Sequence, residues 1–298
     1  MPELPEVQAL ASYLQDRAVG HRIESVVFTA ISALKTVTIA PTELFGGQIS
    51  AVARHGKFLD ISVMPVAGED PSGVEPRRPL HLVIHLARAG WLRYREQLPG
   101  LVPRRGKGPL AMQLRCSDGS GFELTEAGTK KGLAVYIVHE AAEVSGVARL
   151  GPDALAVSPA DFATRIRSHR AQLKGVLTDQ RIICGMGNAY SDEVLHTAKL
   201  SPFAMGARLN DSQLQQLYAA MRDVLEDALL RSVGMQAAEL KKEKHSGLRV
   251  HGRTDLPCPV CQDTIREVSF ADSSLQYCPG CQTGGKLLAD RRLSRLLK

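Results

Sequence analysis

This sequence lacks the features that mark a membrane-bound or secreted protein. None of its apolar stretches is long enough to span a bilayer, and its N-terminal residues are acidic, unlike those of a signal peptide. It also lacks an internal repeat, so a repeat architecture is not expected. We therefore expect no membrane partner.

Cysteine is scarce, and its distribution excludes a disulfide framework. Four of the six cysteines form two CxxC pairs, Cys258-Pro-Val-Cys261 and Cys278-Pro-Gly-Cys281, while Cys116 and Cys184 stand alone as expected structural residues. Two such pairs, separated by residues 262–277, predict one Zn²⁺ held tetrahedrally by four thiolates. A closed shell of four sulfurs leaves no open coordination position, so the predicted metal is structural. The pattern also indicates a reducing compartment.

Length and charge indicate the number of domains and the kind of partner. A chain of 298 residues is too long for one small core and suggests two domains. The formal net charge of +6 and the isoelectric point near 9.1 favour an anionic partner.

The hydrophobic pattern changes near Val144. Before it, a predicted helix at Glu6–Arg17 precedes strands at Ile23–Phe28, Phe58–Val63, Leu80–Leu86 and Leu133–Val138. These predict an N-terminal helix followed by an antiparallel β-sandwich. Two stretches, Val66–Arg78 and the basic Gln97–Leu110 with Arg104, Arg105 and Lys107, are predicted loops. After Val144 the pattern predicts helices at Pro159–Ser168, Leu173–Leu177, Ser191–Leu195 and Asp211–Val233.

The most informative stretch is Met1-Pro-Glu-Leu-Pro-Glu6. Removal of Met1 would leave Pro2 as a secondary amine with a pKa of about 8, partly unprotonated at neutral pH. Such an amine attacks a carbonyl-like carbon to form a charged iminium, and Glu3 beside it is suited to move protons. The same residues also suit an ordinary helix start, with Pro5 in the first turn and acidic side chains that offset the dipole. The motif alone leaves both interpretations open.

Five motifs in order carry a resemblance over about residues 2–282. They are MPELPEV at the start, Arg54-His-Gly-Lys57, Leu150-Gly-Pro152, the stretch from Gly185 to Glu193, and the CxxC pairs. The chain resembles the Fpg/Nei family of DNA glycosylases (formamidopyrimidine-DNA glycosylase and endonuclease VIII).

The resemblance implies an α+β multi-domain fold with an N-terminal helix, an antiparallel β-sandwich, a helix–two-turn–helix domain and a C-terminal zinc ribbon. The expected bounds are 1–138 for the catalytic β-sandwich domain, 139–152 for a linker, 153–249 for the helical DNA-binding domain, 250–283 for the zinc ribbon and 284–298 for a basic tail.

The resemblance also implies a bifunctional DNA glycosylase and abasic-site lyase of base-excision repair. The damaged nucleotide leaves the duplex, Pro2 forms a Schiff base at C1′ and expels the base, and β-elimination follows, often with δ-elimination. Glu3 would protonate the ring oxygen or the leaving group. Glu6 would orient Pro2 or assist proton transfer, with helix stabilisation as the alternative. The implied partner is double-stranded DNA with a damaged base or abasic site, bound by a monomer in a bacterial-type cytoplasm at the nucleoid.

The residues expected to bind DNA include some that depart from the family pattern. Lys57 resembles the lysine that contacts phosphate near the flipped nucleotide, and it is also expected among the catalytic residues, through charge and geometry rather than as a nucleophile. Asn188 resembles the phosphate-binding asparagine, whereas Asp192 and Glu193 are expected to be structural. Arg88 stands where the family has a methionine that fills the gap left by the flipped base. Lys130 or Lys131 would fill that gap from the second loop, and Ser273 occupies the position of the arginine in the zinc finger.

These departures keep two alternative functions open: a damaged-DNA-binding member that excises little, and a glycosylase for bulky adducts or crosslinks. The stretch between Gly234 and Val250 is short for the Fpg branch, so its long lesion-covering loop is expected to be absent.

Overall fold

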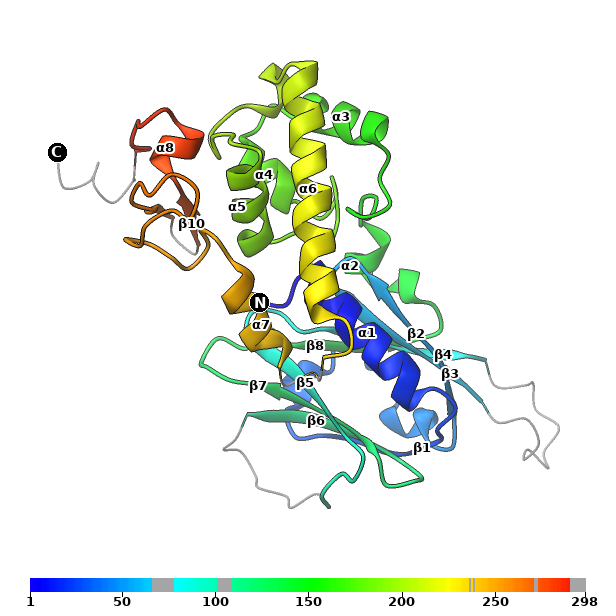
Figure 1. Ribbon diagram of the computed structural model, residues 1–298. Coiled ribbons are helices and arrows are strands. Elements are labelled where there is room, and N and C mark those ends of the chain that lie inside the picture. The colour runs from blue at the N-terminus through cyan, green and yellow to red at the C-terminus, as the bar shows by residue number, and fades with distance from the viewer. Residues whose placement is uncertain (66–77, 101–108, 236, 238, 271–272, 290–298) are drawn as a thin grey trace. The chain divides into compact units, whose positions relative to one another are not determined.

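The structure is a computed structural model that describes residues 1–65, 78–100, 109–235, 237, 239–270 and 273–289. These residues form two compact units, the first from Met1–Arg149 and Ser232–Lys241, the second from Leu150–Arg231 and Lys242–Lys298 (Figure 1). Arg104, Arg105 and Lys107 of the predicted basic loop lie outside the described residues, as does the tail beyond residue 289. No helix within the described ranges combines the length and hydrophobicity needed to cross a membrane.

The first unit contains two four-stranded antiparallel sheets, with the strand orders β1-β6-β7-β5 and β2-β3-β4-β8. One apolar core includes Leu59 and Ile61 of one sheet and Met112 and Leu124 of the other. The sheets therefore pack face to face as the predicted β-sandwich. The strands are β1 (Ile23–Phe28), β2 (Gln48–His55), β3 (Phe58–Met64), β4 (Leu80–His85), β5 (Gly90–Arg95), β6 (Leu110–Cys116), β7 (Gly121–Glu126) and β8 (Ala134–Val138), followed by the short helix α2 (Ser145–Ala148).

Helix α1 (Leu4–Ala18) begins two residues earlier than predicted. The Glu3 amide donates to Glu6 Oε2 at 2.7 Å, and Pro5 occupies the first turn, where its missing N–H costs nothing. Val7, Leu10 and other apolar side chains of α1 lie in the sandwich core. This packing fixes the start of the chain against the first unit.

A second segment of the chain joins the same core. Gly234 adopts a φ of +74°, a conformation that favours glycine, two residues after helix α6 (Asp211–Ser232) ends. Ala237 and Leu240 are buried in the core, and Trp91 Nε1 donates to the Ala237 carbonyl at 2.8 Å. Trp91 therefore has a packing role, and the segment at 232–241 is held by the first unit.

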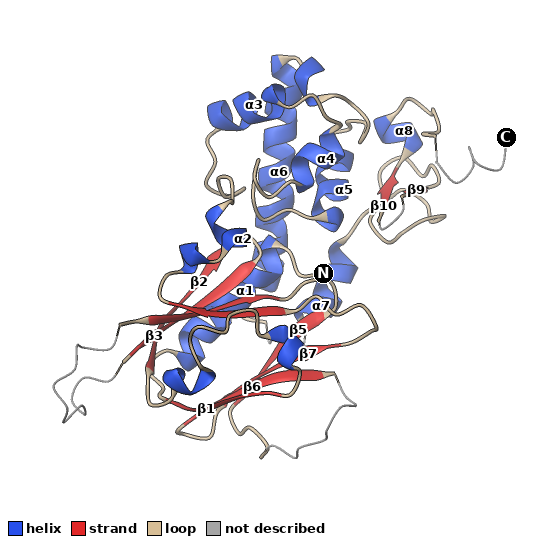
Figure 2. Cartoon of the chain, turned by 180° about the vertical axis from the view of Figure 1, so that it is seen from behind, coloured by secondary structure: helices blue, strands red, loops and turns tan. Residues whose placement is uncertain are grey.

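The second unit is mainly helical and ends in a ribbon of two short strands (Figure 2). Ser158 caps α3 (Pro159–Ser168) by accepting the Asp161 amide. Leu214, Met221 and Leu225 lie on the buried face of α6. The predicted fold class is confirmed. The helices are α3 (Pro159–Ser168), α4 (Leu173–Thr178), α5 (Asn188–Thr197), α6 (Asp211–Ser232), α7 (Leu240–Gly247) and α8 (Pro279–Gln282), and the ribbon strands are β9 (Arg266–Ser269) and β10 (Ser274–Tyr277).

Candidate functional site

The start of the chain buries two carboxylates next to Pro2. Pro2, Glu3 and Glu6 are all buried, although Met1 is 46% exposed. Because Glu6 accepts the Glu3 amide, Glu6 fixes the backbone that immediately follows Pro2. A proline at a fixed position beside two carboxylates is an arrangement suited to amine nucleophile chemistry once Met1 is removed.

Lys57 lies at the tight turn between β2 and β3. Gly56 adopts a φ of +56°, and Arg54 donates to the Gly56 carbonyl at 3.0 Å and to Gln8 Oε1 of α1 at 2.9 Å. These bonds fix the turn against α1, so the buried Lys57 lies on a rigid support. At the base of the turn, buried Asp60 bonds to His55.

His85 lies near Lys57 and was not among the site residues predicted from the sequence. It ends β4, pairs with Phe58 in the sheet, and its ring lies 4.7 Å from the Phe58 ring. Burial, and then the charge of nearby Lys57, lower the pKa of His85 to about 4. A neutral imidazole beside an ammonium group can donate an N–H to an anion that the ammonium attracts. In the sequence, His85 lies three residues before Arg88, which is one of the predicted DNA-binding residues.

Two loops of the first unit lie next to each other: the loop between β4 and β5, and the loop between β7 and β8. In the first, Ala87 has a φ of +51°, and Gly90 donates to the Leu86 carbonyl at 2.9 Å, which closes a turn that exposes Arg88. In the second, a Cβ on Gly132 would lie 3.2 Å from Ala87 Cβ. The candidate residues Arg88, Lys130 and Lys131 therefore come from neighbouring loops of one unit.

Glu126 determines the shape of the second loop. Its buried carboxylate accepts the amides of Gly132 at 2.7 Å and Leu133 at 2.8 Å. Lys131 Nζ donates to the Glu126 carbonyl at 2.6 Å, so this ammonium group bonds to the base of its own loop. Lys130 is exposed at the neighbouring position.

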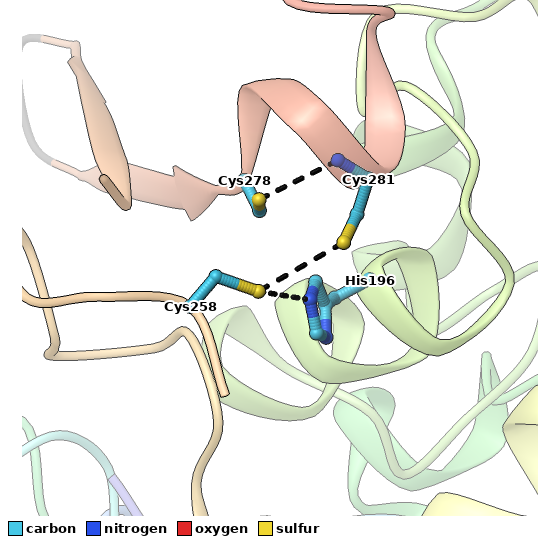
Figure 3. A group of neighbouring side chains, drawn as sticks. All are labelled: His196, Cys258, Cys278 and Cys281. Carbon is cyan, nitrogen blue, oxygen red and sulfur yellow. Dashed lines mark hydrogen bonds between the residues drawn. The ribbon is translucent and has the colours of Figure 1, made fainter. Parts of the chain in front are cut away.

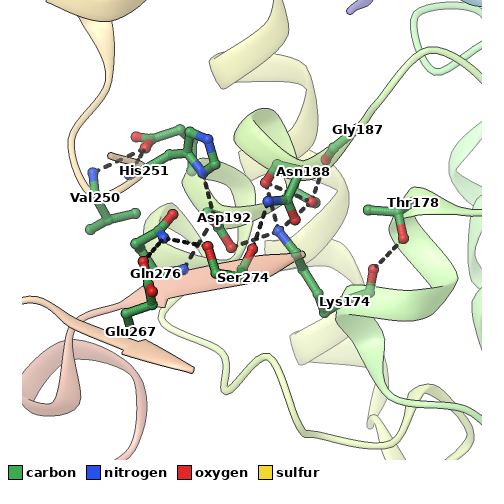
Figure 4. Close-up of polar contacts among 12 residues, drawn as sticks. Lys174, Thr178, Gly187, Asn188, Asp192, Val250, His251, Glu267, Ser274 and Gln276 are labelled. Carbon is green, nitrogen blue, oxygen red and sulfur yellow. Dashed lines mark hydrogen bonds and ion pairs between the residues drawn. The ribbon is translucent and has the colours of Figure 1, made fainter. Parts of the chain in front are cut away.

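Asn188 begins α5, three residues before the predicted helix start, after the glycine turn at 185–187. Gln180 holds this turn, because its side chain accepts the Gly185 amide at 3.0 Å and donates to the Met186 carbonyl at 2.7 Å. Asn188 Nδ2 donates to the Ser274 carbonyl of β10 at 2.6 Å (Figure 4). The ribbon therefore orients the predicted phosphate ligand.

Asp192 and Glu193 are adjacent acidic residues of α5, and both are almost fully buried. Asp192 pairs with Lys174 Nζ at 2.6 Å and His251 Nδ1 at 2.7 Å, and it accepts the Gln276 amide at 3.2 Å (Figure 4). Glu193 accepts three successive backbone amides at residues 249–251, at 2.8, 3.0 and 2.8 Å. Burial raises the pKa of Glu193, although the amide bonds act in the opposite direction. Their contacts are structural, as expected.

The four cysteines of the ribbon come together as a metal site. The sulfur atoms of Cys258 and Cys281 lie 3.8 Å apart and those of Cys261 and Cys278 lie 3.3 Å apart. Sulfurs in a tetrahedral zinc site with Zn–S bonds of about 2.3 Å are about 3.8 Å apart. The Cys258–Cys281 distance has this value and the Cys261–Cys278 distance is shorter, and the clustering of these thiols fits one structural Zn²⁺. Backbone amides of Val260 and Cys281 point at the sulfurs of Cys258 and Cys278.

A histidine that the sequence analysis missed lies at this metal site. His196 Nε2 is 3.3 Å from Cys258 Sγ (Figure 3). Burial, followed by the charges of Arg249 and Lys199, lowers the pKa of His196 to about 4. The residue is 62 positions before Cys258 and belongs to no spacing motif, so the sequence carried no signal for it.

Family models match the chain in three consecutive regions. The formamidopyrimidine-DNA glycosylase N-terminal domain matches residues 1–131, its H2TH domain matches 150–239, and a zinc finger found in FPG and IleRS matches 255–284. A formamidopyrimidine-DNA glycosylase of Solibacter usitatus is 30% identical over 289 residues, which cover 95% of this chain and 99% of that protein. The chain belongs to the formamidopyrimidine-DNA glycosylase family.

A further relative and a solved structure also resemble this chain. An uncharacterized formamidopyrimidine-DNA glycosylase-like protein of Mycobacterium tuberculosis is 64% identical over 149 residues, 50% of this chain and 94% of that protein. The structure of Lactococcus lactis Fpg with DNA containing an abasic site has the same fold, with a TM-score of 0.78 at 22% identity over 94% of this chain and 99% of that one. The fold is thus that of the glycosylase family, with one structural zinc.

The ribbon closes as a hairpin at Ser273, the position that was predicted to correspond to an arginine of the family. Ser273 is exposed, and its carbonyl accepts the Phe270 amide at 2.7 Å, which closes the turn before β10. Its hydroxyl brings no positive charge to this position. The tip residues Ala271 and Asp272 lie outside the described residues.

We expect Asp192→Asn to lower the free energy of unfolding by about 3–5 kcal/mol, because it leaves the buried Lys174 ammonium group without its charged partner. Urea unfolding of the zinc-loaded protein measures the change. The control is Asp211→Asn, which removes an exposed ion pair with Arg167 and should cost less than about 1 kcal/mol. Equal losses in the two variants would contradict the role assigned to Asp192.

We expect Glu126→Ala to loosen the second loop, because the Gly132 and Leu133 amides lose their acceptor, at a cost of about 1–3 kcal/mol. Hydrogen exchange followed by mass spectrometry should show faster exchange at residues 128–133. Glu126→Gln is the matched control, since its side-chain carbonyl can still accept both amides. Unchanged exchange in Glu126→Ala would show that the loop is held by other contacts.

Proposed function

We propose that this protein is a bifunctional DNA glycosylase that excises a damaged base and then cleaves the abasic strand. The observation that carries the proposal is the buried Pro2 followed by the buried carboxylates Glu3 and Glu6, in a chain that belongs to the glycosylase family. The proposed partner is double-stranded DNA with a damaged base or an abasic site. We further propose that the protein acts as a monomer in the cytoplasm.

The proposed chemistry starts from the amine of Pro2 after Met1 is removed. The nitrogen lone pair attacks C1′ of the flipped nucleotide, and the bonding pair of the glycosidic bond leaves with the base, which takes up a proton. The nitrogen then loses its own proton, and its lone pair breaks the bond between C1′ and the ring oxygen, which opens the ring and forms the iminium. Glu3 supplies the proton taken up by the base or by the ring oxygen. The iminium then acidifies the C2′ hydrogens, and loss of one of them expels the 3′ phosphate.

Glu6 has a supporting role in this proposal. Its carboxylate is engaged by the Glu3 amide at 2.7 Å, which favours orientation of the Pro2 backbone over direct proton transfer. A nucleophile held at a fixed position avoids much of the entropic cost of reaching the reacting geometry.

Phosphate binding is assigned to groups in each unit. Lys57 supplies charge from its rigid turn, and His85 beside it supplies a neutral N–H donor. Asn188, at the start of α5, adds an amide donor, since it has a second N–H besides the one bonded to the Ser274 carbonyl. Arg88 and Lys130 are assigned to the gap left by the flipped base, whereas the ammonium group of Lys131 supports the loop.

Borohydride trapping tests the proposed nucleophile. The protein is incubated with a duplex that contains one abasic site, and borohydride reduces any Schiff base to a stable adduct. We expect an adduct with the mature protein and none when an uncleaved N-terminal extension blocks Pro2. Removal of the extension by a protease that leaves Pro2 as the first residue should restore the adduct.

Trapping combined with a DNA-binding measurement distinguishes the lyase from a protein that only binds damaged DNA. Pro2→Gly should lose most of the lyase activity while its affinity for DNA stays within about twofold, because Pro2 makes covalent rather than binding interactions. An absence of adduct in the mature protein, with DNA binding intact, would refute the lyase and indicate either a damaged-DNA-binding protein or a glycosylase without lyase activity.

Lys57→Ala should weaken binding to all duplexes by a similar factor and reduce the slope of log K against log salt by about 1, because one phosphate contact is lost. Fluorescence anisotropy at several salt concentrations measures both quantities. Lys35→Ala, which removes an exposed lysine of the same unit, is the control and should leave the slope unchanged. A loss of affinity confined to one type of lesion would contradict the phosphate role of Lys57.

A further inference from the structure

The zinc site has more protein donors than one tetrahedral ion uses. Besides the four cysteines, His196 contributes an imidazole from α5. The ligand atoms of His196, Cys258, Cys278 and Cys281 all lie within 4.8 Å of one another, and these four residues form a group able to hold one metal ion (Figure 3). Cys261 joins the cluster through Cys278, at a sulfur–sulfur distance of 3.3 Å.

We infer that His196 is a reserve zinc ligand, which replaces Cys261 when the Cys261 thiolate is lost. The site then has two ligand sets, four thiolates or three thiolates and one imidazole. Both are established ligand sets for structural zinc. This exchange is independent of the proposed lyase chemistry.

The surroundings of His196 support this role. The side chain is only 2% exposed, and its Nδ1 is buried without a hydrogen-bond partner in the described part of the chain. The other nitrogen, Nε2, lies against Cys258 Sγ, and the imidazole is therefore directed at the metal cluster.

Cys261 is the ligand most readily lost. It is the exposed member of the cluster, whereas Cys258 and Cys278 are buried and Cys281 is partly buried. A thiol-reactive compound in solvent therefore reaches Cys261 first. In the exchange, the bond between the metal and Cys261 Sγ breaks, a bond to His196 Nε2 forms, and the ring proton resides on Nδ1. The centre loses one negative charge.

This reserve ligand would protect the support of Asn188. His196 is the donor that comes from α5 rather than from the ribbon, and Asn188, Asp192 and Glu193 lie on the same helix. Release of zinc would remove the metal that stabilises the ribbon. Strand β10 would then lose the geometry in which it bonds to Asn188 and Asp192.

Cobalt substitution of the full-length protein tests the ligand sets, because Co²⁺ absorption reports the number of thiolates. The wild-type protein should show a four-thiolate spectrum. Cys261→Ala should still bind one Co²⁺, with the thiolate charge-transfer intensity reduced by about a quarter and a spectrum typical of three sulfurs and one nitrogen. Adding His196→Phe should abolish that spectrum. Cys184→Ala, which removes a thiol outside the cluster, should keep the four-thiolate spectrum.

A spectrum of Cys261→Ala that is unaffected by His196→Phe would overturn the inference, since water would then be the fourth ligand. A second measurement avoids the cysteine variant, which can fail to fold. The wild-type protein and His196→Phe are treated with limiting N-ethylmaleimide, alkylated Cys261 is quantified by mass spectrometry, and released zinc is measured with a colorimetric chelator.

We expect the wild-type protein to retain zinc after Cys261 is alkylated, and His196→Phe to release one zinc for each alkylated Cys261. Equal release from both proteins would show that His196 only donates a hydrogen bond to Cys258, and the inference would fail.

Discussion

Burial of two adjacent carboxylates in α5 is the constraint on which the arrangement of the second unit depends. A buried carboxylate loses several kcal/mol of hydration unless other groups replace the lost water, so Asp192 and Glu193 require donors from elsewhere in the chain. Lys174 comes from α4, the Gln276 amide comes from β10, and His251 lies in the loop before the ribbon. Because these donors belong to separate segments, pairing both carboxylates fixes α4, α5, the loop and the ribbon relative to one another.

The same principle operates at the start of the chain, where the residues assigned to chemistry also stabilise the fold. Glu6 closes the first turn of α1 through the Glu3 amide, and the apolar face of that helix is buried in the sandwich core. The position of Pro2 is therefore determined by helix capping and core packing together. An amine at the end of a flexible segment would lose more entropy on reaching a sugar carbon. The structural and the proposed catalytic interpretation of this motif are thus compatible, since the helix start would also hold the proposed nucleophile in place.

Local patterns in the sequence predicted much of this fold, and long-range contacts account for what they missed. The strand at Ile23–Phe28 and the helix at Pro159–Ser168 have the predicted bounds, because alternation and capping are encoded within a few neighbouring residues. The cysteine spacing predicted the ribbon for the same reason. By contrast, His196 meets its cysteine across 62 positions, and Ala237 meets Trp91 across 146. No local pattern relates such positions, so neither the reserve donor at the zinc site nor the docked segment at 232–241 was foreseen. The roles proposed for Pro2 and Lys57 could be predicted from the sequence because each residue lies in a short contiguous motif.

The neutral residue at the hairpin changes how the ribbon contributes to DNA binding. Ser273 brings no charge that could attract phosphate, whereas the next residue, Ser274, accepts the Asn188 side-chain amide at 2.6 Å through its carbonyl. The same strand donates its Gln276 amide to Asp192 one helical turn further along α5. On the proposed function, the ribbon therefore supports phosphate binding indirectly, by fixing the rotamer of Asn188 and the position of the helix that carries it. A metal-stabilised ribbon remains necessary for this task even without a cationic finger, because a strand can orient a side chain only if it is itself held in place.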